Sequence, residues 1–328
     1  MRRRKLTIEQ YINEIKSGNR FALSQAITLA ESRLFEDQSI AKEIIGKLLA
    51  TTGNSIRIGI TGVPGVGKST FIDQFGILLI KSGFKVAVLS VDPSSQQSKG
   101  SILGDKTRMN QLSLHPEAYI RPTATGSHLG GVAQQTREAI LLCEAAGYNV
   151  IIVETVGVGQ SETIVRHMTD FFLLLMLGGA GDELQGMKRG IMEMADALAI
   201  NKADGNNRDE ALKAKRNYEQ ALHLFPPTKG RLNPKVFTCS ALENQGLSEI
   251  WTFIRRFIDH GKETKYFRLH RQQQQQYWLN ELINRQLTQD FFQQEAIRKM
   301  LPQIQQDVMD SKLTPREGAE RLLKAYRN

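Results

Sequence analysis

A glycine-rich stretch carries the clearest chemical pattern in the sequence. Residues 62–70 read Gly-Val-Pro-Gly-Val-Gly-Lys-Ser-Thr and follow the apolar run Ile56–Ile60. Glycines at these spacings let consecutive backbone N–H groups surround a phosphate where a helix begins, here expected at Phe71. A lysine then contacts the β- and γ-phosphates, and a serine hydroxyl offers a ligand to Mg²⁺. The predicted phosphate-binding residues are Gly62, Val63, Pro64, Gly65, Val66, Gly67, Lys68, Ser69 and Thr70.

A second pattern is an apolar run that ends in a carboxylate. Residues 150–157 read Val-Ile-Ile-Val-Glu-Thr-Val-Gly, which places Glu154 at the tip of a buried strand. This is typical of the second switch of a GTPase, with Glu where Asp is usual. Glu154 can hold Mg²⁺ directly or through water, and the Gly157 N–H can sense a γ-phosphate. Val158 stands where a glutamine often orients the attacking water. Fast unaided hydrolysis is therefore not expected, although Gln160 is a candidate substitute.

A third pattern indicates which base is bound. Residues 201–204 read Asn-Lys-Ala-Asp and follow another apolar run. The carboxylate of Asp204 can accept from both N1–H and the 2-amino group of guanine, a donor pair that adenine lacks. Lys202 is expected along the base, and Asn201 is expected to tie this loop to the phosphate loop. A last guanine-contacting segment follows a later strand and comprises Ser240, Ala241 and Leu242. The four motifs in this order predict a site for GTP and GDP.

Two further acids lie in loops with less distinctive sequences. Asp92 stands at a strand tip beside the phosphate loop, where a role toward Mg²⁺ or the nucleophilic water is favoured over a turn. Asp105, in Leu-Gly-Asp-Lys-Thr-Arg, fits a metal ligand and an ordinary turn residue equally well. The glycine-dense, charged segment 178–190, which contains Lys188, is interpreted as a nucleotide-responsive switch rather than a linker. On these patterns Lys68, Asp92 and Glu154 are the residues expected to carry the reaction.

The distribution of glycine divides the chain into three parts. Of 27 glycines, 2 precede residue 51, 24 lie in 51–261 and 1 follows. The ends show apolar residues at helical spacing, and the middle alternates short continuous apolar runs with helical segments. Continuous runs are typical of parallel strands covered on both faces. The predicted strands are Ile56–Ile60, Val86–Val91, Ala118–Arg121, Val150–Glu154, Phe171–Leu177, Ala197–Ile200 and Lys235–Thr238.

The sequence thus predicts an α/β fold with a doubly wound, mainly parallel sheet of the P-loop NTPase kind and helical extensions at both ends. The expected parts are a helical extension at 1–50, a nucleotide-binding core at 51–261 and a helical region at 262–328. Composition narrows the classes of function. The 328 residues carry two cysteines, which cannot form a disulfide framework or a four-ligand zinc site. No apolar run is long enough to span a bilayer.

The net charge of +9 is spread mostly over the ends and is interspersed with acids. No aromatic-basic pattern accompanies it, so a solvated surface is favoured over nucleic-acid binding. We expect a soluble, cytoplasmic protein that binds neither nucleic acid nor membrane.

These motifs together resemble the MeaB/ArgK family of P-loop GTPases, within the SIMIBI class. The resemblance covers nearly the whole chain and rests on segments 91–95, 104–109, 129–132, 154–162 and 181–191 in addition to the nucleotide motifs. It implies Mg²⁺ near Ser69, Asp92, Asp105 and Glu154, and it agrees with Glu at position 154. It also implies that the loop around Lys188 is a third switch, and that the C-terminal helices, with apolar residues around Trp278, Leu282 and Leu287, form a homodimer.

The resemblance further implies a GTPase chaperone of an adenosylcobalamin-dependent methylmalonyl-CoA mutase. Such a protein would gate cofactor loading and protect the mutase, with slow intrinsic turnover that the partner accelerates. Two alternatives come from other classes. One is a transport-associated ATPase or protein kinase acting on substrate-binding proteins, which the guanine motif at 201–204 disfavours. The other is a membrane-targeting or metal-delivery GTPase, for which a Cys/His cluster or an apolar docking surface is missing from the sequence.

Overall fold

The structure, a computed structural model, describes residues 6–91, 109–122, 129–155, 161–179 and 189–327. They divide into two compact units, Met1–Arg271 and Gln272–Asn328.

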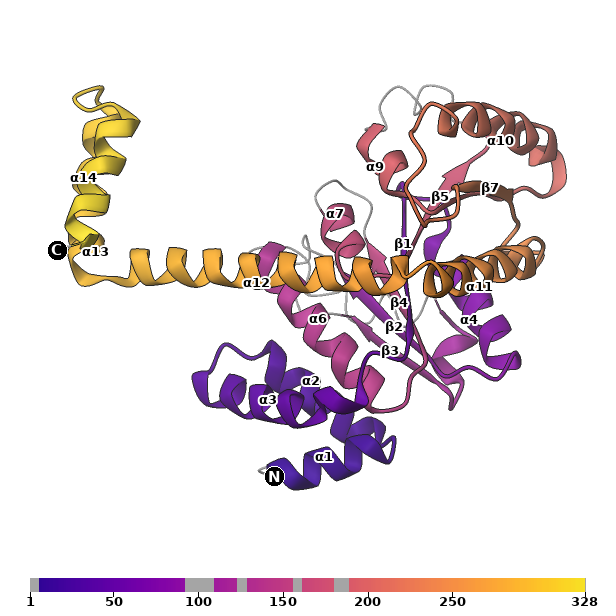
Figure 1. Ribbon diagram of the computed structural model, residues 1–328, viewed down its shortest axis with the longest axis horizontal. Helices are drawn as coiled ribbons and strands as arrows, with labels where there is room; N and C mark the ends of the chain where they lie inside the picture. The colour runs from indigo at the N-terminus through magenta and orange to yellow at the C-terminus, as the bar shows by residue number, and fades with distance from the viewer. Residues whose placement is uncertain (1–5, 92–108, 123–128, 156–160, 180–188, 328) are drawn as a thin grey trace. The chain divides into compact units, whose positions relative to one another are not determined.

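The first unit is built on a parallel sheet. The described residues form seven strands in the order β3-β2-β4-β1-β5-β6-β7 (Figure 1). All pairs are parallel, as in the pairing of β1 with β4 and β5. All seven predicted strands are confirmed. Their bounds are β1 Ile56–Gly62, β2 Val86–Val91, β3 Ala118–Pro122, β4 Val150–Thr155, β5 Phe171–Leu177, β6 Ala197–Asn201 and β7 Lys235–Thr238.

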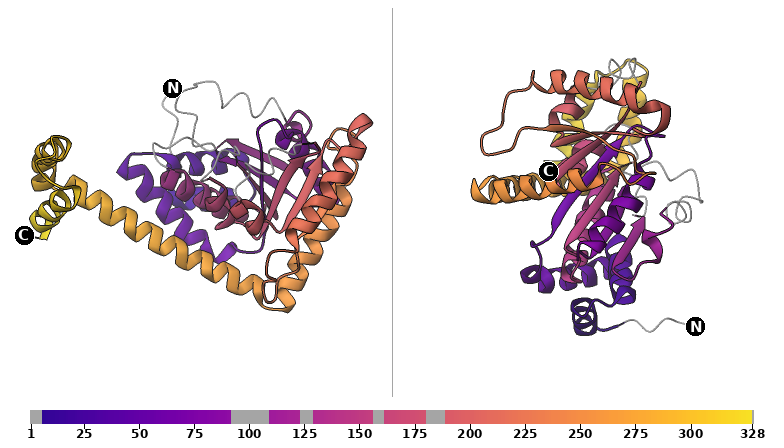
Figure 2. Two further views of the ribbon diagram at one scale, coloured as in Figure 1. Left: turned by 90° about the horizontal axis from the view of Figure 1, so that it is seen from above. Right: turned by 90° about the vertical axis from the view of Figure 1, so that its right-hand side faces the viewer.

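Helices cover both faces of the sheet, which explains why the strands are apolar throughout (Figure 2). On one face, Ile58 and Ile60 of β1 share a core with Phe75 of α4 (Lys68–Lys81) and Ile254 of α11 (Leu247–Glu263). On the other face lie α6 (Leu129–Ala145), α7 (Ser161–Arg166), α9 (Arg189–Met194) and α10 (Arg208–Leu222). Short 3₁₀ helices η1 (Leu49–Thr51), η3 (Leu112–Leu114) and η4 (Gly205–Asn207) complete the described connections. This is the predicted doubly wound fold.

The N-terminal extension is helical, as predicted, and packs against α6. It comprises α1 (Ile8–Lys16), α2 (Arg20–Glu31) and α3 (Phe35–Leu48). Thr7 and Gln10 form a capping box at the start of α1. Glu31 of α2 forms an ion pair with Arg121 of β3, so the extension is also bonded to the edge of the sheet.

The C-terminal region is also helical, with α12 (Tyr266–Gln293), α13 (Glu295–Met309) and α14 (Pro315–Arg327). The second unit has a small core of its own around Ile297, Ile304 and Leu322. Thr314 caps the start of α14, because its Oγ1 accepts from the Glu317 N–H at 3.2 Å. Among the described helices, none combines the length and the apolar composition that a bilayer crossing requires.

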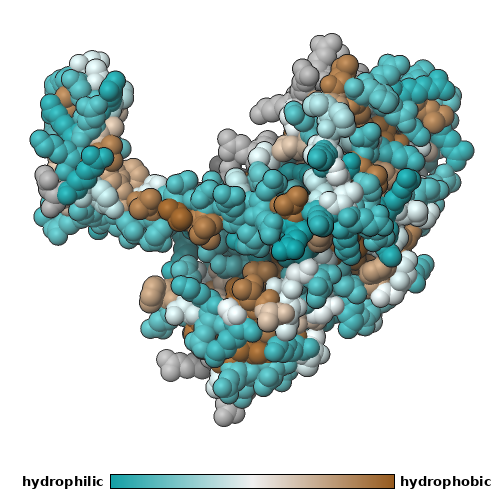
Figure 3. Space-filling view, viewed as in Figure 1, coloured by the Kyte–Doolittle hydropathy of each residue, from teal (hydrophilic) through white to brown (hydrophobic). Residues whose placement is uncertain are grey.

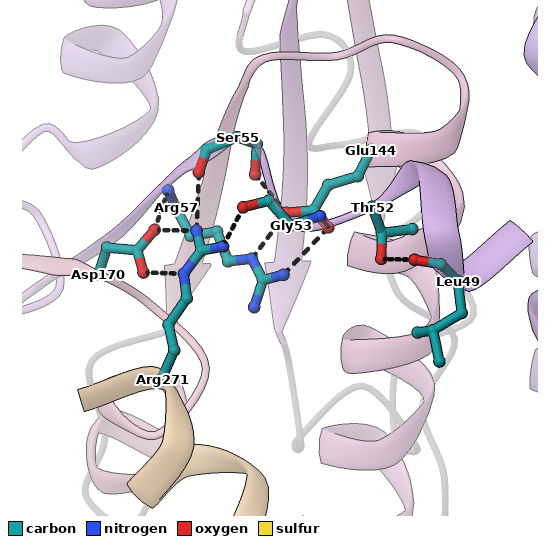
Figure 4. Close-up of polar contacts among 8 residues, drawn as sticks. All are labelled: Leu49, Thr52, Gly53, Ser55, Arg57, Glu144, Asp170 and Arg271. Carbon is teal, nitrogen blue, oxygen red and sulfur yellow. Dashed lines mark hydrogen bonds and ion pairs between the residues drawn. The ribbon is translucent and has the colours of Figure 1, made fainter. Parts of the chain in front are cut away.

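A buried network of charges lies where β1 and β5 begin (Figure 4). The Arg57 guanidinium donates to both carboxylate oxygens of Glu144, at 2.9 and 3.0 Å. Asp170 accepts from the Arg57 N–H at 2.9 Å and from Arg271 at 2.8 and 2.7 Å. Arg271 also donates to the carbonyl oxygens of Gly53 and Ser55. The network therefore joins five parts of the chain: residues 53–55 before β1, β1 itself, α6, the residue before β5 and the start of α12.

Ionisation of Asp170 depends on these arginines. Burial alone would raise its pKa, but Arg271 and Arg57 outweigh burial and hold the pKa of Asp170 below its usual value. The two arginines thus stabilise the ionised form of the buried Asp170 carboxylate.

His270 predicts a pH dependence of stability. Its ring stacks on Tyr266 and lies 3.2 Å from the Thr169 carbonyl oxygen. Burial first, and then the charge of Arg166, lower the pKa of His270 to about 4, against the opposing effects of Asp196 and Asp170. The unfolded chain, with a histidine pKa of about 6.5, binds this proton more readily. The contribution of neutral His270 to the free energy of unfolding is therefore fully present above about pH 6.5, and it is lost as the pH drops toward 4.

We expect His270→Gln to flatten part of this dependence. Between pH 7.5 and 5.0 the free energy of unfolding of the unmodified chain should fall by about 2 kcal/mol through this residue. Urea unfolding at both pH values measures it, with the exposed His223→Gln as the matched control. Equal pH slopes for His270→Gln and the unmodified chain would contradict the assignment.

Candidate nucleotide site

The phosphate loop lies between β1 and α4 and depends on glycine at two positions. Gly67 has φ +91° and an added Cβ would lie 2.9 Å from the Asn201 amide nitrogen. A Cβ on Gly62, at φ +154°, would collide with the carbonyl oxygen of Leu175. The loop thus runs close to both β5 and the end of β6, and only glycine permits that approach.

Helix α4 begins at Lys68, three residues before the predicted start at Phe71. Gly67 supplies a left-handed N-cap residue, and the Phe71 N–H donates to the Gly67 carbonyl oxygen at 2.9 Å. Lys68 and Ser69 therefore lie in the first turn. There the N–H groups lack intrahelical acceptors and, with the positive end of the helix dipole, favour an anion.

Lys68 is folded over this loop. Its Nζ donates to the carbonyl oxygens of Gly62, at 2.8 Å, and Val63, at 3.3 Å. Burial lowers the pKa of Lys68, while the charges of Glu154 and Glu162 act in the opposite direction. The ammonium group is thus held against two carbonyl oxygens of the phosphate loop, in a position from which a phosphate can compete for it.

Glu154 lies at the end of β4 with only 8% of its surface exposed. The Ser90 hydroxyl of β2 lies 3.4 Å from its carboxylate, and Thr61 of β1 bonds Thr155 at 2.6 Å. Because β1 lies beside β4 and runs parallel to it, Glu154 and the loop that leads to Ser69 share one edge of the sheet. Hydroxyl and carboxylate oxygens are suitable ligands for Mg²⁺.

Part of the predicted metal set lies outside the described residues. Of the four expected ligands, the structure describes Ser69 and Glu154 but not Asp92 or Asp105. Gly157 and Lys188 also fall outside it. Within the described ranges, no group of three or more His, Cys, Asp or Glu side chains could hold a metal ion.

The end of β6 is bonded to the phosphate loop. The buried Asn201 amide donates to the Val66 carbonyl oxygen at 2.9 Å, and its Oδ1 accepts from the Ala241 N–H at 3.1 Å. The side chain of Asp204 accepts from the Ser240 hydroxyl at 2.5 Å. The Asn201 side chain thus links its own segment, 201–204, to the phosphate loop and to segment 240–242. Ser240 of segment 240–242 also holds the Asp204 carboxylate.

The remaining residues of the base-reading segments are more exposed. Lys202 has an unusual positive φ of +58°, a conformation shared by few non-glycine residues. The side chain of Leu242 is 80% exposed. Because its side chain is exposed, Leu242 can contact a ligand through its backbone or lie beside it, but it cannot enclose it in a buried pocket.

Sequence reasoning assigned no role to Glu162. It lies in the first turn of α7 with 2% exposure, and its charge acts on Lys68. The sequence feature that could have indicated Glu162 is its place as an acid in the first turn of the helix that follows the second switch. Apolar periodicity reports which face of a helix is buried but not which polar side chain is buried with it.

A phosphate loop with a Lys-Ser pair, an acidic strand tip beside it and an Asn-Lys-Ala-Asp segment bonded to it define the class: the chain is a P-loop GTPase. It belongs to the MeaB family, because the family model described as methylmalonyl Co-A mutase-associated GTPase MeaB matches residues 23–296.

Individual relatives agree with this placement. The chain is 45% identical over 316 residues to the GTPase ArgK of Escherichia coli strain K12, covering 96% of each chain. It is 40% identical over 331 residues to the mouse protein named methylmalonic aciduria type A homolog, mitochondrial, covering 98% of this chain and 80% of that one. A crystal structure described as LAO/AO transport system kinase superposes with a TM-score of 0.80 at 38% identity, over 99% of both chains.

Proposed function

We propose that this GTPase is a chaperone of an adenosylcobalamin-dependent methylmalonyl-CoA mutase. It binds the mutase, gates loading of the cofactor and protects the enzyme from inactivation. The observation that carries the proposal is the match of residues 23–296 to a family described by its association with that mutase. The name of the mouse relative supports the same metabolic context.

In this proposal the nucleotide is GTP with Mg²⁺. Lys68 leaves the carbonyl oxygens that it contacts in this structure and binds the β- and γ-phosphates. Ser69, Asp92, Asp105 and Glu154 would hold Mg²⁺, which when bound would supply neutralisation of phosphate charge. The donor set fits, because all four side chains offer the oxygen ligands that Mg²⁺ prefers.

Base selection belongs to the segments that Asn201 links. Asp204 accepts from the guanine N1–H and 2-amino groups, while Ser240 fixes the orientation of its carboxylate. Lys202 lies along the base, and Ala241 and Leu242 flank it. Gly157 and Lys188 report the state of the γ-phosphate to the partner. Hydrolysis then releases the switch segments.

We also propose that the chain is a homodimer through residues 262–328. Helix α12 exposes a row of apolar side chains at helical spacing, and Figure 3 shows apolar residues along this helix. The exposed fractions are 58% for Leu279, 37% for Leu282, 47% for Ile283 and 56% for Leu287. A second copy offers the same row, as an isologous interface requires.

Nucleotide hydrolysis with and without the mutase tests the proposed function. Purified protein is assayed with GTP and with ATP, alone and with a methylmalonyl-CoA mutase from the same source. Stimulated GTP turnover with negligible ATP turnover is the expected result. Strong ATP preference would instead favour a transport-associated ATPase or protein kinase; the similar crystal structure is described as LAO/AO transport system kinase. GTP preference without stimulation would refute the mutase as client.

Lys188 tests how the partner reads the nucleotide. We expect Lys188→Ala to keep its GDP affinity within about twofold and to lose about tenfold of the stimulation by the mutase, a typical size for coupling between two sites. The exposed Lys213→Ala on α10 is the control, since its ammonium contacts only Glu210 in the described structure. Unaltered stimulation in Lys188→Ala would show that its loop is a linker.

A further inference from the structure

The base-reading segment 201–204 turns sharply at Lys202. Its φ of +58° lies in the left-handed region, which costs free energy for a residue with a Cβ. This turn brings Lys202 Cε to 3.9 Å from the point that a Cβ on Gly67 would occupy. The stem of Lys202 therefore lies against the phosphate loop. A conformation of this cost persists only where neighbouring contacts compensate for it.

One such contact comes from Asn207. Its Nδ2 donates to the Lys202 carbonyl oxygen at 2.8 Å. Because a carbonyl oxygen only accepts, the nitrogen end of the amide must face it. The Asn207 N–H also donates, to the Asp204 carbonyl oxygen at 3.0 Å. One side-chain bond and one backbone bond of Asn207 thus close residues 202–207 into a compact turn.

The peptide group after Lys202 is held from both sides. Its carbonyl oxygen accepts from Asn207, and its N–H, which belongs to Ala203, donates to the Cys239 carbonyl oxygen at 3.0 Å. A peptide group is planar, so two bonds on opposite sides fix its rotation. This rotation sets the backbone angles on either side of the plane. It therefore helps to decide where the Lys202 side chain and the following Asp204 carboxylate lie.

The place of Asn207 in the chain makes this bond unusual. Asp204 and Asn207 are the N-cap residues of η4 and α10, where Asp and Asn side chains commonly accept from N–H groups of the first turn. In the described structure neither side chain forms such a cap. Asp204 accepts from Ser240 instead, and Asn207 turns back to Lys202. Both side chains thus contribute to the base-reading segments rather than to the helices that they precede.

We propose that Asn207 is a positioning residue for recognition of the guanine base. The inference rests on the proposed function, since it takes Lys202 and Asp204 as the residues that contact the base. Asn207 does not touch the nucleotide in this scheme. It holds the left-handed turn in the free protein, so that a guanine nucleotide does not have to order the turn when it binds.

Competition between labelled GDP and unlabelled GDP or ADP tests the inference. Asn207→Asp is the decisive variant, because its carboxylate cannot donate to the Lys202 carbonyl oxygen, whereas aspartate caps a helix as well as asparagine does. Asn207→Ala removes the same donor without adding charge. We expect both variants to bind GDP about tenfold more weakly, the size of one lost hydrogen bond. ADP affinity, which depends on the phosphate loop, should stay within about twofold.

The ratio of GDP to ADP affinity separates positioning from a structural role. A residue that only caps α10 would leave Asn207→Asp unchanged, and general damage to the site would weaken GDP and ADP equally. Either result would overturn the inference. The matched control is Asn206→Ala, the exposed neighbour in η4, which should keep both affinities. Equal affinity of the unmodified chain for GDP and ADP would refute the base-reading role of Asp204 itself, and the inference with it.

Discussion

Replacing Lys68 with alanine is expected to abolish GTP hydrolysis, with a fall in turnover on the order of 10³-fold or more. The ammonium group is the cation of the phosphate loop, and the structure places it against the Gly62 and Val63 carbonyl oxygens within that loop. The Lys68 side chain is partly buried, and this burial lowers its pKa. A charge in such a surrounding stabilises developing phosphate charge far more than an exposed one.

Phosphate release at saturating GTP measures this effect, and binding of a labelled GDP separates loss of catalysis from loss of affinity. Lys81→Ala is the matched control, because Lys81 is exposed at the other end of the same helix. Its turnover should stay within about twofold of the unmodified chain. Normal turnover in Lys68→Ala would overturn the assignment of the phosphate loop.

Asp204→Asn is expected to change the preferred base from guanine to xanthine. An amide oxygen still accepts from N1–H, but the amide NH₂ opposes the 2-amino group of guanine and complements the 2-carbonyl of xanthine. We expect GTP affinity to fall by about 100-fold or more and the affinity for xanthosine triphosphate to exceed it. Ser240 can still donate to the amide oxygen, so the loop should keep its conformation.

Competition binding with GTP, xanthosine triphosphate and ATP measures the change. The control is Asp209→Asn, an exposed acid in the first turn of α10 that should leave base preference unaltered. An unchanged preference for GTP in Asp204→Asn would refute the base-reading role of this carboxylate.

The strands and the order of the nucleotide motifs could be predicted because both depend on local sequence. Continuous apolar runs predicted the bounds of every strand to within two residues. The start of α4 was predicted wrongly at Phe71. It depends on the left-handed conformation of Gly67, which positions the first turn three residues earlier. Spacing alone does not report a backbone angle.

Polar residues that act across the fold were beyond sequence reasoning. Asp73 sits in an apolar helix and would be assigned to its solvent face, yet it bonds a backbone 39 residues away. Glu162 is likewise a buried acid whose charge acts on a distant residue, Lys68. The Arg57, Glu144, Asp170 and Arg271 network joins positions up to 214 residues apart, and no periodic pattern links them. Burial of a polar group becomes visible only when its partner is placed.

Arg271 also sets an order of events during synthesis of the chain. At about 5–20 residues per second, the 101 residues from Asp170 to Arg271 take about 5–20 s to be added. During that interval the Asp170 carboxylate has the Arg57 N–H but not its guanidinium partner, and a buried charge without its partner is strongly destabilising. The charge network where β1 and β5 begin can therefore be completed only after the first turns of α12 have been made. A nascent chain that stops before Arg271 leaves the nucleotide-binding unit unfinished.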